Sequence, residues 1–190
     1  MKIKLIIIIA MSLLLGSNKL ETPEYTLIKK FKDFELRNYS SMVIATTKMN
    51  MGYSQSTSRG FQKVASYIFG GNDRNMKIEM TAPVLTSIAE EDNLFHEVSF
   101  VMPKKHKFQS LPKPSRNDVD LREKEIGMVA VLSFGGWATE ERSKKNIKKL
   151  KKYLRRENIV LGKEIIIAQY NSPWVVPPFR KNEIIISIVQ

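Results

Sequence analysis

The order of predicted strands and helices repeats once along this chain of 190 residues, and this repeat constrains the fold more than any other feature. Alternating apolar residues predict strands, whereas apolar residues spaced three and four apart predict a helix. In the first half these patterns place strands at 25–39 and 41–49, a helix at 54–71, and strands at 76–88 and 96–103. In the second half they place one or two strands at 120–136, a helix at 139–158, and strands at 164–172 and 183–190. The sequence therefore predicts two β-α-β-β pseudo-repeats, at about 25–103 and 120–190.

Both predicted helices carry one apolar face. In the first helix the residues of this face are Phe61, Val64, Ala65 and Ile68. In the second helix they are Ile147, Leu150 and Leu154. Such a face must pack against another element, and the predicted strands supply it. We expect an α+β fold in which the strands form one curved sheet or distorted β-barrel, flanked by one helix from each half.

The first 19 residues predict an export signal. Lys2 and Lys4 precede an apolar run from Leu5 to Gly16, which is shorter than the roughly 20 residues needed to span a bilayer. We expect a periplasmic or secreted protein, with cleavage near residues 16–20 or retention of the signal as an uncleaved membrane anchor. A buried N-terminal strand or helix is the alternative.

The chain is strongly basic, with a formal net charge of +12. Nine Lys or Arg residues lie between Arg142 and Arg156, around the apolar face of the second predicted helix. No helix-turn-helix or RNP-like motif accompanies them, so we expect no nucleic-acid partner. The charge predicts a solvated basic face, with weak contact to an anionic membrane surface as the alternative.

Residues suited to catalysis or metal binding are few. The chain has no cysteine, which excludes disulfides, thiolate metal sites and cysteine nucleophiles. His96 and His106 lack metal-ligand spacing, so we expect no metal site. Glu79 and Glu183 are the candidates for a cavity base. A salt bridge to Arg180 or Lys181 is the simpler explanation of these glutamates, and we expect no enzymatic activity.

An apolar slot with a basic rim is the strongest binding feature. Apolar side chains lie on or near the first helix, at Phe61, Ala65 and Tyr67. The loop at 172–180 is fixed by three prolines and carries Trp174, Val175, Val176 and Phe179. Basic residues for acid groups of a flat ligand are Arg59, Lys63, Arg180 and Lys181. The alternative is that the loop only closes the barrel.

Four sequence blocks resemble the SOUL haem-binding family, in the order of that family. They are "FELRNY" (34–39), "SRGFQKVASYIFGGND" (58–73), "MKIEMTAPV" (76–84) and "YNSPWVVPPFRKNEI" (170–184). The resemblance covers about residues 24–189 and places the domain at 24–190. It implies a distorted β-barrel of two β-α-β-β repeats, related to gyrase-inhibitor-like domains, with "MTAPV" in the strand after the first helix.

The resemblance also implies a function: non-covalent, non-enzymatic binding of haem or another tetrapyrrole. We expect a monomer. The implied cleft lies between the first helix and the late proline-rich loop. By position, its residues are Ser58, Arg59, Phe61, Ala65, Ser66, Trp174 and Val175. Some family members carry a histidine proposed to bind iron where this chain has Asn38, so we expect haem binding without histidine ligation. A hydrolase-like or tetrapyrrole-modifying enzyme that uses a cavity glutamate is the alternative.

Overall fold

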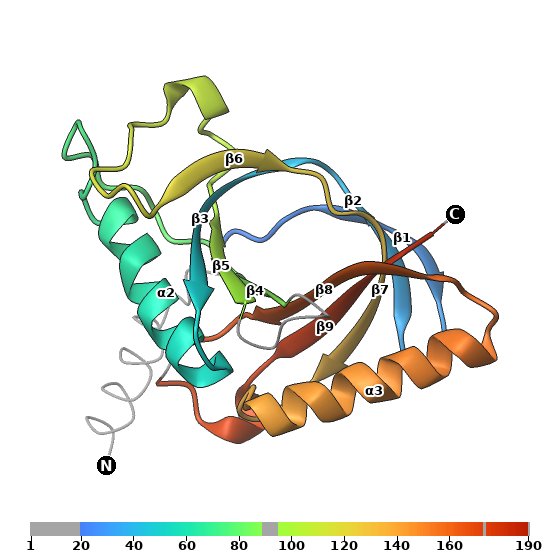
Figure 1. Ribbon diagram of the computed structural model, residues 1–190. Helices are drawn as coiled ribbons and strands as arrows, with labels where there is room; N and C mark the ends of the chain where they lie inside the picture. Colours follow the sequence, from blue (N-terminus) through green and yellow to red (C-terminus); the bar gives the residue numbers. More distant parts are fainter. Residues whose placement is uncertain (1–19, 89–94, 173, 190) are drawn as a thin grey trace, which may run out of the picture.

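The computed structural model describes residues 20–88, 95–172 and 174–189, which form one antiparallel sheet flanked by two long helices (Figure 1). The predicted export signal lies outside the described residues. In the first half the elements are β1 (Tyr25–Lys30), β2 (Glu35–Tyr39), β3 (Met42–Asn50), α2 (Tyr53–Ile68), β4 (Val84–Ile88) and β5 (Phe95–Val101). A short 3-10 helix, η1 (Phe108–Ser110), follows. In the second half they are β6 (Asp120–Lys124), β7 (Gly127–Phe134), α3 (Glu140–Arg156), β8 (Leu161–Gln169), η2 (Pro177–Phe179) and β9 (Asn182–Ile188).

The two halves of the sheet have the same internal order. In the first half β5 lies between β3 and β4, and in the second half β9 lies between β7 and β8. The halves join where β4 pairs with β8, with Thr86 opposite Ile167. Helix α2 connects β3 to β4, and α3 connects β7 to β8. The predicted α+β fold is therefore confirmed: a curled, barrel-like sheet built from two β-α-β-β units with one helix each.

The strand that precedes each unit pairs with the other unit. Strand β2 pairs with β7, and β6 pairs with β3. This exchange ties the two halves of the chain together at both ends of the sheet. It also brings residues of β2 close to β9, the last strand.

The two faces of the sheet bury different residues. On β9, Ile184 packs in one cluster with Leu150 of α3, whereas Ile185 belongs to a cluster on the concave face. Val64 of α2 packs in a third cluster with Phe100 of β5. The apolar faces predicted for both helices thus lie against the sheet. Among the described residues, no helix is both long and apolar enough to cross a bilayer.

Two predicted strands differ from the structure. The segment 25–39 is a hairpin of β1 and β2, turned where the Phe31 amide donates to the Phe34 carbonyl over 2.9 Å. Of the segment 76–88, only β4 is a strand. Pro83 has no N–H for a ladder, and the Ala82 amide donates instead to the Glu21 carbonyl. The "MTAP" residues therefore form a connector that leads into β4.

Candidate functional site

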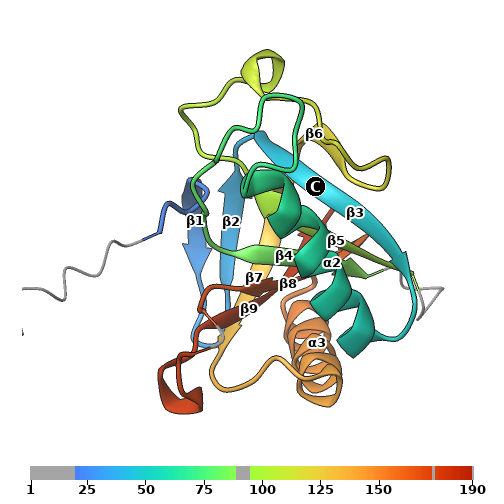
Figure 2. The ribbon, with the colours of Figure 1, turned by 90° about the vertical axis from the view of Figure 1, so that its left-hand side faces the viewer.

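A cleft of about 690 Å³ lies beside α2, on the outer side of β4 and β8. Figure 2 faces this side of the molecule, with α2 in front of β5 and the η2 segment below. One wall is the loop between β8 and β9, residues 170–181, which we call the late loop. The residues around the cleft are Leu20, Ser54, Thr57, Ser58, Phe61, Gln62, Met80, Thr81, Ala82, Val84, Thr86, Trp137, Gln169, Tyr170, Asn171, Ser172 and Arg180.

Two of the residues predicted to bind a ligand line this cleft, namely Ser58 and Phe61. Phe61 is half-buried, and its ring centroid lies 5.1 Å from that of Phe100. The other five predicted residues are not among those that line the cleft. On α2, Ala65 is buried against the sheet, whereas Arg59 and Ser66 are exposed. On the late loop, Trp174 is 91% exposed and Val175 is half-buried.

Thr86 is a cleft residue that the sequence did not single out. It lies in β4, on the face opposite Leu85, which packs in the concave cluster. Its side chain is fully buried, and its hydroxyl has no hydrogen-bond partner among the described residues. A buried hydroxyl without a partner costs about 1–3 kcal/mol, and this one lies beneath the surface of the cleft, with no accessible area toward it. Only the alternation of β4 could have suggested it.

The late loop is held in shape by Arg180. Its Nη1 donates to the carbonyls of Val175 and Ser172, over 2.8 and 3.2 Å. Its guanidinium carbon lies 4.0 Å from the ring centroid of Trp137, a cation–π contact. Arg180 thus brings a positive charge to the edge of the cleft, as expected from the sequence. The same hydrogen bonds fix the wall of the cleft.

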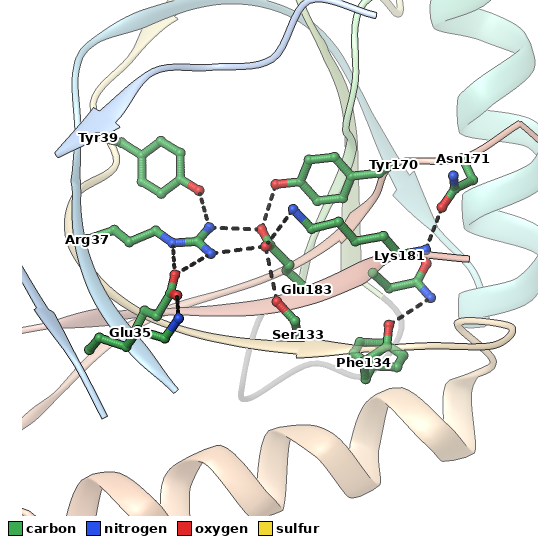
Figure 3. Close-up of polar contacts among 11 residues, drawn as sticks. Glu35, Arg37, Tyr39, Ser133, Phe134, Tyr170, Asn171, Lys181 and Glu183 are labelled. Atoms are coloured by element: carbon green, nitrogen blue, oxygen red, sulfur yellow. Dashed lines mark hydrogen bonds and ion pairs between the residues drawn. The ribbon is translucent and has the colours of Figure 1, made fainter. Parts of the chain in front are cut away.

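A buried charged network lies behind the cleft, on the concave face of the sheet (Figure 3). The carboxylate of Glu183 accepts hydrogen bonds from Arg37 over 3.1 and 3.2 Å, and from Tyr170 over 2.5 Å. The Ser133 hydroxyl and the Lys181 ammonium each lie 3.2 Å from it. Tyr170 connects the two sites, because it also lines the cleft.

The network fixes the charge of Glu183. Burial alone acts to raise its pKa, but the hydrogen bond from Tyr170 and the charge of Arg37 outweigh burial and hold the pKa below the ordinary value. Burial, and then the charge of Glu183, raise the pKa of Tyr170. Glu183 is therefore a paired carboxylate next to a protonated phenol, which is a poor arrangement for a general base.

Glu79, the other candidate base, is exposed. Its carboxylate lies 2.6 Å from the ammonium of Lys105, and this hydrogen bond lowers its pKa. Both glutamates are thus salt-bridged, although Glu79 pairs with Lys105 instead of Arg180 or Lys181.

The histidines lie away from the cleft. His96 is buried, with Nδ1 3.1 Å from the Met51 carbonyl oxygen, and its ring meets the edge of Tyr53. His106 lines a separate pocket of about 190 Å³ near Glu21. The described residues contain no cluster of three or more His, Asp or Glu side chains that could hold a metal ion.

Comparisons with known proteins cover nearly the whole described chain. Residues 20–187 match the model of the SOUL heme-binding protein family. Heme-binding protein 2 of Homo sapiens is 30% identical over 146 residues, which cover 74% of this chain and 71% of the human protein.

Solved structures with the same fold are much more distant in sequence. An uncharacterized conserved protein from Listeria innocua has a TM-score of 0.64 at 9% identity, covering 83% of this chain and 93% of its own. A hydrolase from the same organism has a TM-score of 0.58 at 10% identity, covering 85% and 94%. At these identities the likeness shows the fold alone.

Proposed function

We propose, from the premise that this chain belongs to the SOUL heme-binding protein family, that it binds haem or another flat, apolar, anionic tetrapyrrole without a covalent bond. The proposed site is the cleft between α2 and the late loop. The observation that supports the proposal is this cleft, whose lining includes Ser58 and Phe61 of α2 together with residues of the late loop.

The cleft has the size and lining of a small-molecule site. Its volume of about 690 Å³ lies within the roughly 300–1,000 Å³ of ligand pockets. Phe61, Val84 and Trp137 offer apolar contact to a flat ligand. Ser58 and Asn171 can donate hydrogen bonds to carboxylates at the edge of that ligand. Arg180 adds a positive charge, although its guanidinium already binds loop carbonyls.

Met80 is the best candidate for an iron ligand from this chain. Histidine, methionine and tyrosine all serve as axial ligands of haem iron. Both histidines lie outside the cleft, and the Tyr170 phenol donates to Glu183. Among the residues that line the cleft, Met80 is then the one with an uncommitted soft donor atom. This fits the expectation of haem binding without histidine ligation.

The role is binding, and catalysis has little support. Neither Glu79 nor Glu183 has the raised pKa that a general base at neutral pH requires. The protein acts as a monomer outside the cytoplasm, and the support for export is the apolar run at 5–16 behind Lys2 and Lys4.

A haem titration of the purified chain, followed by its Soret band, tests the proposal. We expect a saturable one-to-one shift that persists in His96→Ala and His106→Ala. Phe61→Asp places a carboxylate in the apolar lining and weakens binding by about ten-fold or more. Phe69→Asp is the matched control, because Phe69 is 64% exposed just beyond α2 and outside the cleft.

Two results would contradict the proposal. Absence of a saturable shift would separate haem from the function of this chain. Equal weakening by Phe61→Asp and Phe69→Asp, or loss of the shift with either histidine, would place the ligand elsewhere.

A further inference from the structure

The late loop exposes a cluster of large apolar side chains. Trp174, Val176 and Phe179 are 91%, 54% and 77% exposed, and they lie within six residues. Trp137, 47% exposed, adjoins them because Arg180 packs on its ring and the neighbouring Gly136 amide donates to the Pro177 carbonyl. Single exposed apolar residues are common, but a continuous patch marks a contact surface.

The backbone of this loop satisfies most of its polar groups internally. The carbonyls of Ser172 and Val175 accept from Arg180, and the Val176 carbonyl accepts from the Phe179 amide. The Pro177 carbonyl accepts from the Arg180 amide as well as from Gly136. Moving such a segment from water into lipid costs little free energy, because few of its backbone groups lose a hydrogen-bond partner.

A basic surface lies at the same end of the molecule as this apolar patch. Figures 1 and 2, taken at right angles, both place η2 and α3 at the lower end of the molecule. Leu150 and Leu154 of α3 point inward, and the exposed outer face carries Lys145, Lys148, Lys149 and Lys152. The sequence from Arg142 to Arg156 contains no acidic residue.

We propose that these two features form one membrane-docking surface, whose partner is an anionic lipid bilayer. Trp174, Val176 and Phe179 enter the interface between headgroups and acyl chains, while the lysines of α3 bind lipid phosphates. Trp137 lies at the edge of this surface. A tryptophan ring suits that position, because tryptophan favours the boundary between lipid and water. The bilayer is favoured over a protein partner because aromatic insertion beside a purely basic face matches the chemistry of an anionic membrane.

The cleft opens next to the same surface. Trp137, Ser172 and Arg180 belong both to its lining and to the segments that carry the docking surface. Leu20, the first described residue, also lines the cleft, and the apolar run at 5–16 precedes it in the sequence. Docking therefore turns the cleft toward the bilayer. An apolar ligand can then move from the bilayer into the cleft with little exposure to water.

The two tryptophans make the proposal measurable in the full chain. Trp137 and Trp174 are its only tryptophans, so intrinsic fluorescence reports on this surface and not on the N-terminal segment. With vesicles of phosphatidylglycerol and phosphatidylcholine we expect a blue shift and quenching by brominated acyl chains. Trp137→Phe leaves Trp174 alone and should retain both signals.

Matched variants separate the two parts of the surface. Phe179→Ser should weaken vesicle binding, whereas Phe69→Ser removes an exposed ring elsewhere and should not. The triple variant Lys145→Glu, Lys148→Glu, Lys152→Glu should weaken it on the order of ten-fold or more. Binding should also fall between 0.1 M and 1 M salt, because the screening length falls from about 10 Å to about 3 Å.

The opposite results would overturn the proposal. Unquenched tryptophans on vesicle-bound protein would mean that another segment makes the contact. Equal binding to pure phosphatidylcholine, or no effect of the charge reversals, would exclude the lysines of α3. A blue shift that rises with protein concentration in the absence of lipid would assign the patch to a second copy of the chain. None of these measurements involves haem, so they succeed or fail independently of the proposed ligand.

Discussion

Thr86 and Thr46 are both buried threonines, but their hydroxyls differ in one respect. The Thr46 hydroxyl lies 2.7 Å from that of Ser99, whereas the Thr86 hydroxyl has no partner in the described chain. We expect Thr86→Val to raise the free energy of unfolding by about 1 kcal/mol, because it removes an uncompensated buried polar atom. The same change should leave haem affinity unchanged, because the hydroxyl has no accessible surface toward the cleft. Urea unfolding and Soret titration measure the two effects.

Thr46→Val is the control for that prediction. It leaves Ser99 without its partner and should lower the free energy of unfolding by about 1–2 kcal/mol, with haem affinity unchanged. If both variants change stability in the same direction, the difference assigned to the two hydroxyls is wrong.

The thioether of Met80 provides a second test at a single residue. Met80→Leu keeps an apolar side chain of similar volume but removes the sulfur, so binding should persist while the spectrum of the reduced haem complex changes. Met76→Leu is the matched control, since Met76 packs in the cluster under α2 and does not line the cleft. Identical spectra for both variants would rule out ligation by Met80.

At the scale of elements, sequence periodicity predicted the helices well and the connectors poorly. The apolar positions of α2 and α3 repeat at helical spacing, and that pattern depends only on local geometry. The segment 76–83 is apolar like a strand, but its amides bind the Ile68 and Glu21 carbonyls, and these contacts are not visible in the pattern. The hairpin of β1 and β2 was missed for a similar reason, because alternation continues on both sides of its turn.

The lining of the candidate site was only partly predictable. Ser58 and Phe61 were expected near a ligand and line the cleft, because the sequence placed α2 correctly. Ala65 was expected in the site but does not line the cleft. It belongs to the apolar face with which α2 packs on the sheet, and that packing buries it. Thr86 and Trp137 come from distant segments, which only the folded sheet brings to α2.

At the scale of the whole molecule, a fully buried ion pair joins the first and second halves of the chain. Arg37 of β2 and Glu183 of β9 meet because β2 pairs with β7, and their side chains are 5% and 0% exposed. Arg37 keeps a second carboxylate partner, Glu35, 2.7 Å away, so removing Glu183 costs less than the about 3–5 kcal/mol of a buried charge without compensation. We therefore expect Glu183→Gln to lower the free energy of unfolding by about 2–3 kcal/mol at pH 7, as measured by urea unfolding. Glu79→Gln, on an exposed glutamate, should change it little.

The pH dependence of stability gives the same network a second, independent test. The pKa of Glu183 is lower in the folded chain than its ordinary value of 4.5, so the folded state favours the ionised carboxylate. Its contribution is complete above pH 4.5 and disappears as the pH falls through the folded value. The wild-type chain should thus lose stability on acidification below pH 4.5, and Glu183→Gln should lose less over the same range. Parallel curves for the two proteins would show that folding does not lower the pKa of Glu183, and the ion pair with Arg37 would then not stabilise the fold.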